Sequence, residues 1–252
     1  MSISRSDSPP PSPAAQPADL GRFFQDLLEI LEEWKPLLEE LFSGPDARPS
    51  RREVDAVVEP LTTALLGRAD YPLAGGGFVA AHEALADAPW HMAWWQGRSK
   101  EVQVVLSSVE SMGEAYSRRE WFTVPLETGA SHVTGPYVDF ICTDEYTVTL
   151  TSPVRVGGTV VGVVGADVFV ESLEEVLLPD LRAVHPEASL VNRVGRVVVS
   201  ADPQLAAGRL LVGDWRQTPD PARMDLRGPE YAGRLAAVHP CGSLPLAVVV
   251  PA

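Results

Sequence analysis

The sequence is poor in cysteine, in basic residues and in long apolar runs. Only two cysteines, Cys142 and Cys241, occur among 252 residues, so we expect buried or idle thiols and no disulfide framework. No apolar run reaches the ~18 residues that a membrane-spanning helix needs, so no membrane insertion is predicted. The 20 Lys and Arg residues against 34 Asp and Glu residues give a net charge of −14. That balance argues against nucleic-acid binding.

Short motifs of several enzyme classes are also absent. The five histidines show no HxxxH or HExxH spacing, so we predict no metal site. Gly75-Gly76-Gly77 is not followed by the Lys of a phosphate-binding loop, and no Gly-x-Ser-x-Gly elbow occurs. We therefore predict no cofactor and no enzymatic activity.

The N-terminal segment, residues 1–18, is rich in Ser and Pro and has no apolar core. This composition is typical of a disordered leader and not of a secretion signal. Because no membrane segment is predicted either, we expect a cytoplasmic protein.

Residues 19–69 are predicted to form two helices. Asp19 is the predicted N-cap of a long helix that ends near Gly44 and is kinked at Pro36. Ser50 and Glu53 have the spacing of a capping box, which predicts a second helix. We expect the apolar stripe of the first helix, Trp34 included, to lie in the core, and we expect that this helix can mediate a homodimer. The stripe comprises Leu20, Phe23, Phe24, Leu27, Leu28, Ile30, Leu31, Trp34, Leu37, Leu38 and Leu41.

Residues 70–182 show the shorter period of β-strands and are predicted to form a ligand-binding module of five strands. The adjacent Trp94 and Trp95 must face opposite sides of their strand, so one is expected in the core and the other in the pocket wall. The segment 112–135 has no clear period and is interpreted as a long functional loop. The expected elements are strands at 90–95, 102–107, 146–154 and 159–168, a turn at 156–158 and a helix at 171–181 whose inward residues include Val176.

Residues 183–252 show a weaker pattern that predicts a smaller second module. A hairpin is expected from strands at 188–192 and 196–200, and the last two strands are expected at 232–238 and 244–249. Helices followed by two antiparallel-sheet modules make an α+β fold.

The segment from Arg119 to Asp167 carries the candidate site. Donors come first, in Arg119-Glu120-Trp121-Phe122, and acceptors follow in Tyr137-Val138-Asp139 and at Asp167. Converging donors and acceptors suit the carboxylate and ammonium groups of a free amino acid. Three alternatives remain open: Arg119 as a surface residue, Asp139 as a turn residue and Asp167 as the cap of the helix near residue 171. His132 lies in the same segment and is either a ligand contact or a solvated loop residue.

The run from Pro153 to Asp167, Pro-Val-x(3)-Gly-x-x-x-Gly-Val-x-Gly-x-Asp, resembles the double Cache family, which consists of tandem PAS-like sensor modules. The resemblance implies long N-terminal helices followed by two PAS-like modules, the second smaller. The Arg-x-Trp-aromatic and Tyr-x-Asp motifs resemble the amino-acid-binding branch of that family. By this resemblance Arg119 and Trp121, next to the aromatic Phe122, would hold a ligand carboxylate. Tyr137, Asp139 and Asp167 would hold its ammonium group.

Two positions depart from the branch. Glu114 stands where a Tyr is expected, and Tyr116 is the predicted substitute; Pro125 replaces an expected Ala. Relatives usually carry membrane helices and a signalling domain. Because this sequence shows neither, we expect a sensor that signals through a separate partner protein. The alternatives are an interaction module with a degenerate pocket and an enzyme that uses the Asp139/Asp167 pair.

Overall fold

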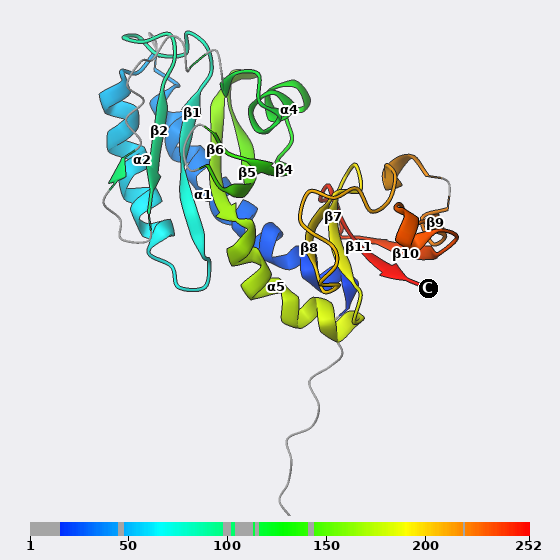
Figure 1. The fold of residues 1–252 in the computed structure, drawn as a ribbon. Coiled ribbons are helices and arrows are strands. Elements are labelled where there is room, and N and C mark those ends of the chain that lie inside the picture. The colour runs from blue at the N-terminus through cyan, green and yellow to red at the C-terminus, as the bar shows by residue number, and fades with distance from the viewer. Residues whose placement is uncertain are drawn as a thin grey trace, which may run out of the picture.

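The computed structural model describes residues 16–44, 48–97, 102–103, 113, 116–140, 144–218 and 220–252. Helices come first, followed by two antiparallel sheets (Figure 1). The helical part consists of a 3₁₀ helix η1 (Pro17–Gly21), α1 (Arg22–Leu41) and α2 (Arg51–Leu66). The predicted α+β class, with two PAS-like sheet modules of which the second is smaller, is confirmed.

The first sheet has six strands in the order β3-β2-β1-β6-β5-β4. The helix α4 (Glu120–Thr128) stands between β3 and β4 in the chain. The strands are β1 (Leu73–Ala80), β2 (Met92–Gln96), β3 (Val102–Gln103), β4 (His132–Val138), β5 (Tyr146–Val156) and β6 (Thr159–Phe169).

The second sheet has five strands in the order β8-β7-β11-β10-β9. The helix α5 (Val170–Val184) leads to it from the first sheet, as Figure 1 shows. Its elements are β7 (Ser189–Asn192), β8 (Val197–Ser200), η2 (Trp215–Gln217), β9 (Met224–Asp225), η3 (Pro229–Tyr231), β10 (Leu235–Pro240) and β11 (Leu246–Pro251).

The two faces of the first sheet are covered by different helices. On one face α1 contacts β5, and α2 contacts β1 and β2; on the other face α4 contacts β4, β5 and β6 (Figure 1). The N-terminal η1 contacts β10 and β11 of the second sheet, so η1 and α1 together reach both sheets. The apolar stripe of α1 explains this packing, since Leu27, Leu31 and Leu38 are completely buried in a core that continues into the second sheet.

Of the two predicted helix starts, the one at Ser50 is confirmed and the one at Asp19 is wrong. Ser50 and Glu53 form the predicted capping box, with the Ser50 hydroxyl accepting from the backbone N–H of Glu53. Asp19 is not an N-cap of α1. It lies inside η1, where its carboxylate accepts from the backbone N–H of Gln16 at 3.2 Å and pairs with Arg22 at 2.6 Å. Pro36 lies inside α1 without ending it, and Trp34 is buried as expected.

Several other predictions need correction. The first sheet has six strands instead of five, and α4 and β4 occupy much of the expected loop at 112–135. Pro125 is inside α4. α5 is longer than predicted and leaves Val176 exposed. Residues 104–107 of the predicted second strand, Glu114 and Cys142 lie outside the described residues, while Cys241 is a buried free thiol.

The division of the chain into 19–69, 70–182 and 183–252 stays a prediction, and α5 runs through the second boundary. Within the described residues, no helix has the length and apolar character to cross a membrane.

The packing of α1 leads to a stability prediction. Leu31→Ala should lower the free energy of unfolding by about 2–5 kcal/mol, because it leaves a cavity where a completely buried side chain packs. The matched control is Leu37→Ala on the same helix, whose side chain is 47% exposed and whose loss should change stability by less than about 1 kcal/mol. Urea unfolding monitored by circular dichroism measures both. Equal effects of the two substitutions would contradict the observed orientation of α1.

Candidate ligand-binding pocket

A narrow cavity opens between the first sheet and α4. The space between its lining atoms is about 300 Å³, of which about 20 Å³ can hold the centre of a water molecule. That is little more than one water needs, so a larger ligand has to displace the walls slightly. The lining combines three aromatic rings with two carboxylates: Met92, Trp94, Trp121, Tyr137, Asp139, Thr149 and Asp167.

The pairing of the central strands determines where Asp167, the acidic end of the pocket, lies. Asp167 of β6 pairs with Thr149 of β5 on one side and with Gly75 of β1 on the other. Paired residues in an antiparallel sheet point to the same face, which is here the face covered by α4. The side chain of Asp167 is therefore buried beneath α4, with an exposure of 5%.

An irregularity in β4 adds two more pocket residues. The register between β4 and β5 shifts between Thr134, which pairs with Thr149, and Tyr137, which pairs with Thr147. In a regular strand, residues three apart point to opposite faces. The irregularity removes this alternation, so Tyr137 and Thr134 both point to the pocket face. Two residues later Asp139 points to the same face and is 6% exposed.

Two hydrogen bonds fasten α4 over the cavity. The Thr151 hydroxyl donates to the backbone oxygen of Trp121 at 2.7 Å, and His132 pairs with Glu120 at 2.9 Å. The bond from His132 holds the pKa of the Glu120 carboxyl below its usual value. His132 is thus not a solvated loop residue. It is a buried strand residue outside the cavity lining, and it anchors the first turn of α4.

A chain of hydrogen bonds joins the polar residues of the pocket. The Thr149 hydroxyl donates to Asp167 Oδ1 at 2.6 Å, so its oxygen accepts from the Tyr137 hydroxyl at 2.6 Å. Burial raises the pKa of Asp167 to about 7; the Thr149 bond opposes this shift, and the negative charge of Asp139 adds to it. Asp167 therefore exchanges a proton near neutral pH, which an isolated surface aspartate does not.

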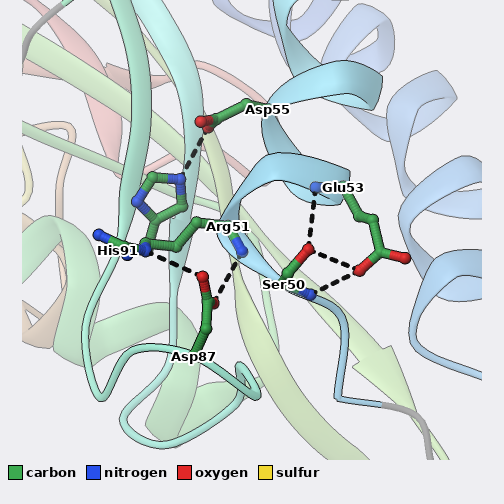
Figure 2. Close-up of polar contacts among 6 residues, drawn as sticks. All are labelled: Ser50, Arg51, Glu53, Asp55, Asp87 and His91. Carbon is green, nitrogen blue, oxygen red and sulfur yellow. Dashed lines mark hydrogen bonds and ion pairs between the residues drawn. The ribbon is translucent and has the colours of Figure 1, made fainter.

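The opposite wall of the pocket is held by α2. Figure 2 shows that the connection from β1 to β2 is tied to the start of this helix, where Asp87 accepts from the backbone N–H of Arg51 at 2.9 Å. In the same view His91 bonds to Asp55 at 2.7 Å. His91 immediately precedes β2, which supplies Met92 and Trp94 to the cavity. These contacts fix the position at which β2 begins.

The structure brings four of the seven predicted ligand residues to the cavity: Trp121, Tyr137, Asp139 and Asp167. Arg119 is exposed at the N-cap position of α4 and does not line the cavity. Tyr116 and Phe122 pack against Trp121, with ring centroids 6.2 and 5.9 Å from it, and form the wall behind the lining. Asp167 does not cap α5, whose N-cap residue is Phe169.

Two lining residues were not predicted from the sequence: Met92 and Thr149. The alternation of strand β5 could have indicated Thr149, because it lies two residues from Thr147 and from Thr151 on the same face. Trp94 was expected in the core or in the pocket wall, and the structure decides for the wall; Trp95 joins the main core. Within the described ranges no cluster of His, Cys, Asp and Glu could hold a metal ion.

Comparisons with known proteins agree with this fold. Residues 91–175 match the family model described as the first PDC sensor domain of methyl-accepting-chemotaxis-protein-like proteins. A search of characterised protein sequences finds no match. The predicted double Cache resemblance is thus confirmed for the fold, with the sensor-domain model matching the segment that carries the pocket.

Solved structures with this fold include bacterial receptor domains. The ligand-binding domain of the Pseudomonas aeruginosa PAO1 amino-acid chemoreceptor PctC, in complex with GABA, has a TM-score of 0.57 at 18% identity, covering 93% of this chain and 94% of that chain. The Pseudomonas fluorescens chemoreceptor CtaA with L-isoleucine gives 0.60 at 18% identity, covering 93% and 86%. The extracellular domain designated mmHK1S-Z3 gives 0.61 at 16% identity, covering 95% and 91%.

The raised pKa of Asp167 predicts a pH-dependent stability. Between the ordinary value of 3.8 and about 7, the folded state keeps a proton that the unfolded chain releases. The free energy of unfolding should therefore fall as pH rises through this range, on the order of 3 kcal/mol from about pH 4.5 to about pH 8. Asp167→Asn should lack this loss. Parallel pH profiles of the two proteins in urea unfolding would contradict the prediction.

Thr149 should tune the proton affinity of Asp167. Thr149→Val keeps the shape of the side chain but removes the donor, so the pKa of Asp167 should rise by about one unit. Thr149→Ser keeps the hydroxyl and is the matched control, with the wild-type value expected. Titration of the Asp167 carboxyl carbon by NMR measures all three proteins. An unchanged pKa in the valine variant would mean that the hydrogen bond does not stabilise the charged form.

Proposed function

We propose that the protein is a small-molecule sensor whose pocket binds a free amino acid or a related amine. The observation that carries this proposal is the presence of two buried carboxylates, Asp139 and Asp167, in one small aromatic cavity. Burial and the nearby charge of Asp139 both disfavour ionisation of Asp167, and a cation that enters the cavity would offset that penalty. A ligand ammonium group would supply that charge, accept stabilisation from the aromatic faces and fit the limited volume.

The ammonium end of the site is assigned to Tyr137, Asp139 and Asp167. The Tyr137 hydroxyl, which bonds to Thr149 at the edge of the cavity, would accept a hydrogen bond from a ligand N–H. Asp167 has to be ionised to bind the ammonium, so ligand binding should expel its proton near and below neutral pH. Affinity should consequently fall as pH drops below the pKa of Asp167.

The carboxylate end is assigned to Trp121 and Arg119. Trp121 lines the cavity and brings an indole N–H, while Arg119 starts the same helix two residues earlier. Because Arg119 is exposed in this conformation, its side chain would have to turn inward when the ligand binds. A rearrangement of one surface side chain costs little beyond the entropy of ordering it.

Binding of an amine without a carboxylate is the second candidate. It is favoured by the lining itself, which holds two carboxylates and, among the described residues, no cationic side chain. The solved structures of similar fold favour the first candidate instead, because GABA in PctC and L-isoleucine, L-serine and L-alanine in CtaA all carry both a carboxylate and an ammonium group.

We further propose that the bound ligand is read by a separate partner protein and that the pocket binds without chemical conversion. Helix α1 offers a route for the signal, since it contacts β5 beside the pocket strands and continues through η1 to the second sheet. The cytoplasmic location and a homodimer through the N-terminal helix stay predictions. Cell fractionation and sedimentation of the purified protein test them.

The central experiment is isothermal titration calorimetry with a panel of amino acids and their decarboxylated amines. At least one ligand is expected to bind, and Asp167→Asn should weaken it by about 2–5 kcal/mol while the circular dichroism spectrum stays unchanged. Arg119→Ala should weaken the amino acid but not its amine, and Arg118→Ala at the neighbouring exposed position is the matched control.

The outcomes separate the candidate functions. Equal wild-type affinity for an amino acid and its amine would assign the pocket to amines and remove the role of Arg119. Failure of every ligand to bind would instead support an interaction module with a degenerate pocket. A new product in the ligand mixtures would support an enzyme that uses Asp139 and Asp167.

A further inference from the structure

Unpaired polar groups gather on the pocket face of the first sheet. Buried side-chain nitrogen or oxygen atoms without a hydrogen-bond partner occur, among the described residues, in Thr62, Trp94, Gln96 and Thr134. Thr62 is on α2, behind the sheet, while the other three lie on the pocket face. Buried donors without partners are rare, and clustering beside a cavity indicates that something bound there completes them.

Two of these groups are neighbours above Gly75. On β2, Trp94 pairs with Gly77 and Gln96 pairs with Gly75, so both side chains point to the pocket face. Trp94 Nε1 and Gln96 Cγ lie 2.8 and 3.0 Å from the point where a Cβ of Gly75 would stand. The indole N–H of Trp94 and the side chain of Gln96, whose amide nitrogen is also buried without a partner, therefore lie side by side over Gly75.

That spot adjoins the acidic end of the pocket. Gly75 is the strand partner of both Gln96 and Asp167, so Gln96 and this carboxylate belong to one row, and Trp94 stands in the next row on the same face. Glycine is required there, because a Cβ at Gly75 would collide with the indole nitrogen. The far edge of the ring reaches Gly165 of β6, whose Cβ would lie 3.3 Å from Trp94 Cη2. The indole thus lies flat across β1 and forms part of the cavity wall.

We propose that the indole N–H of Trp94 and the side-chain amide of Gln96 form a second subsite, which binds an oxygen atom on the side chain of the ligand. This inference rests on the proposed function and specifies its substrate class. The donors are neutral and lie next to Asp167, so a second carboxylate on the ligand would be repelled by the acidic end. A hydroxyl or amide oxygen is the acceptor that fits, on a side chain short enough for the narrow cavity.

The subsite should discriminate sharply between ligands of equal shape. An aliphatic side chain would leave both donors buried and unpaired, whereas a hydroxyl group of the same size satisfies them. Threonine and valine differ in this one group, a hydroxyl in place of a methyl. Threonine is expected to bind about 10-fold or more tightly than valine to the wild type.

The test is calorimetry of threonine and valine on the wild type and on two variants. Trp94→Phe keeps an aromatic wall but removes the N–H, and Gln96→Met keeps the length of the side chain but removes the amide. The preference is the logarithm of the ratio between the dissociation constants of valine and threonine. In each variant this logarithm should fall to less than about half its wild-type value. The matched control is Trp95→Phe, on the opposite face of the same strand, which should keep the full preference.

A second readout follows the donor directly. The indole ¹H–¹⁵N signal that disappears in Trp94→Phe identifies Trp94, and it should move downfield when threonine binds but not when valine binds. Equal affinities of threonine and valine, or a preference that survives in both variants, would overturn the second subsite while leaving the proposed function intact. If no amino acid or amine binds, both proposals fall together.

Discussion

The pocket depends on the buried carboxylate of Asp167, whose ionisation is disfavoured by burial and supported by a hydrogen bond from Thr149. Asp167 lies at the centre of a row that runs across four strands, from Gln96 through Gly75 and Asp167 to Thr149. Burial alone would keep it protonated at neutral pH, and the Thr149 hydroxyl partly opposes that tendency. A group poised in this way responds to any cation that enters the cavity, because the cation converts an unfavourable charge into a paired one.

The two faces of the first sheet have different roles, since one forms the hydrophobic core and the other forms the pocket around Asp167. On the face of α1 and α2, alternate residues such as Leu150 and Val164 form a dry core that stabilises the sheet. On the face of α4, glycines at 75 and 165 leave room for the indole of Trp94 to lie flat. An unsatisfied site is destabilising, and the dry core on the other face offsets its cost.

Sequence reasoning recovered the features whose physical signal is local. The capping box at Ser50 and the apolar stripe of α1 have periods and spacings that lie within a few residues, and both appear as expected. The glycine turn between β5 and β6 is of the same kind, since Gly157 and Gly158 adopt positive φ values of 57° and 87°. α4 was missed because Pro125 and mixed polarity hide its period, although tertiary packing beneath it makes the helix stable.

The candidate site was only partly accessible from sequence for the same reason. The chemical types and the order of Trp121, Tyr137, Asp139 and Asp167 are written in the chain, and so are the alternating residues of β5. Which face each side chain occupies is decided by register, and the irregularity at residues 134–137 changes that face within a single strand. Tertiary structure alone placed Arg119 outside the cavity lining and brought Trp94 and Gln96 close to Asp167. The pairing of β1 with β6 joins segments about 90 residues apart, and no local pattern encodes it.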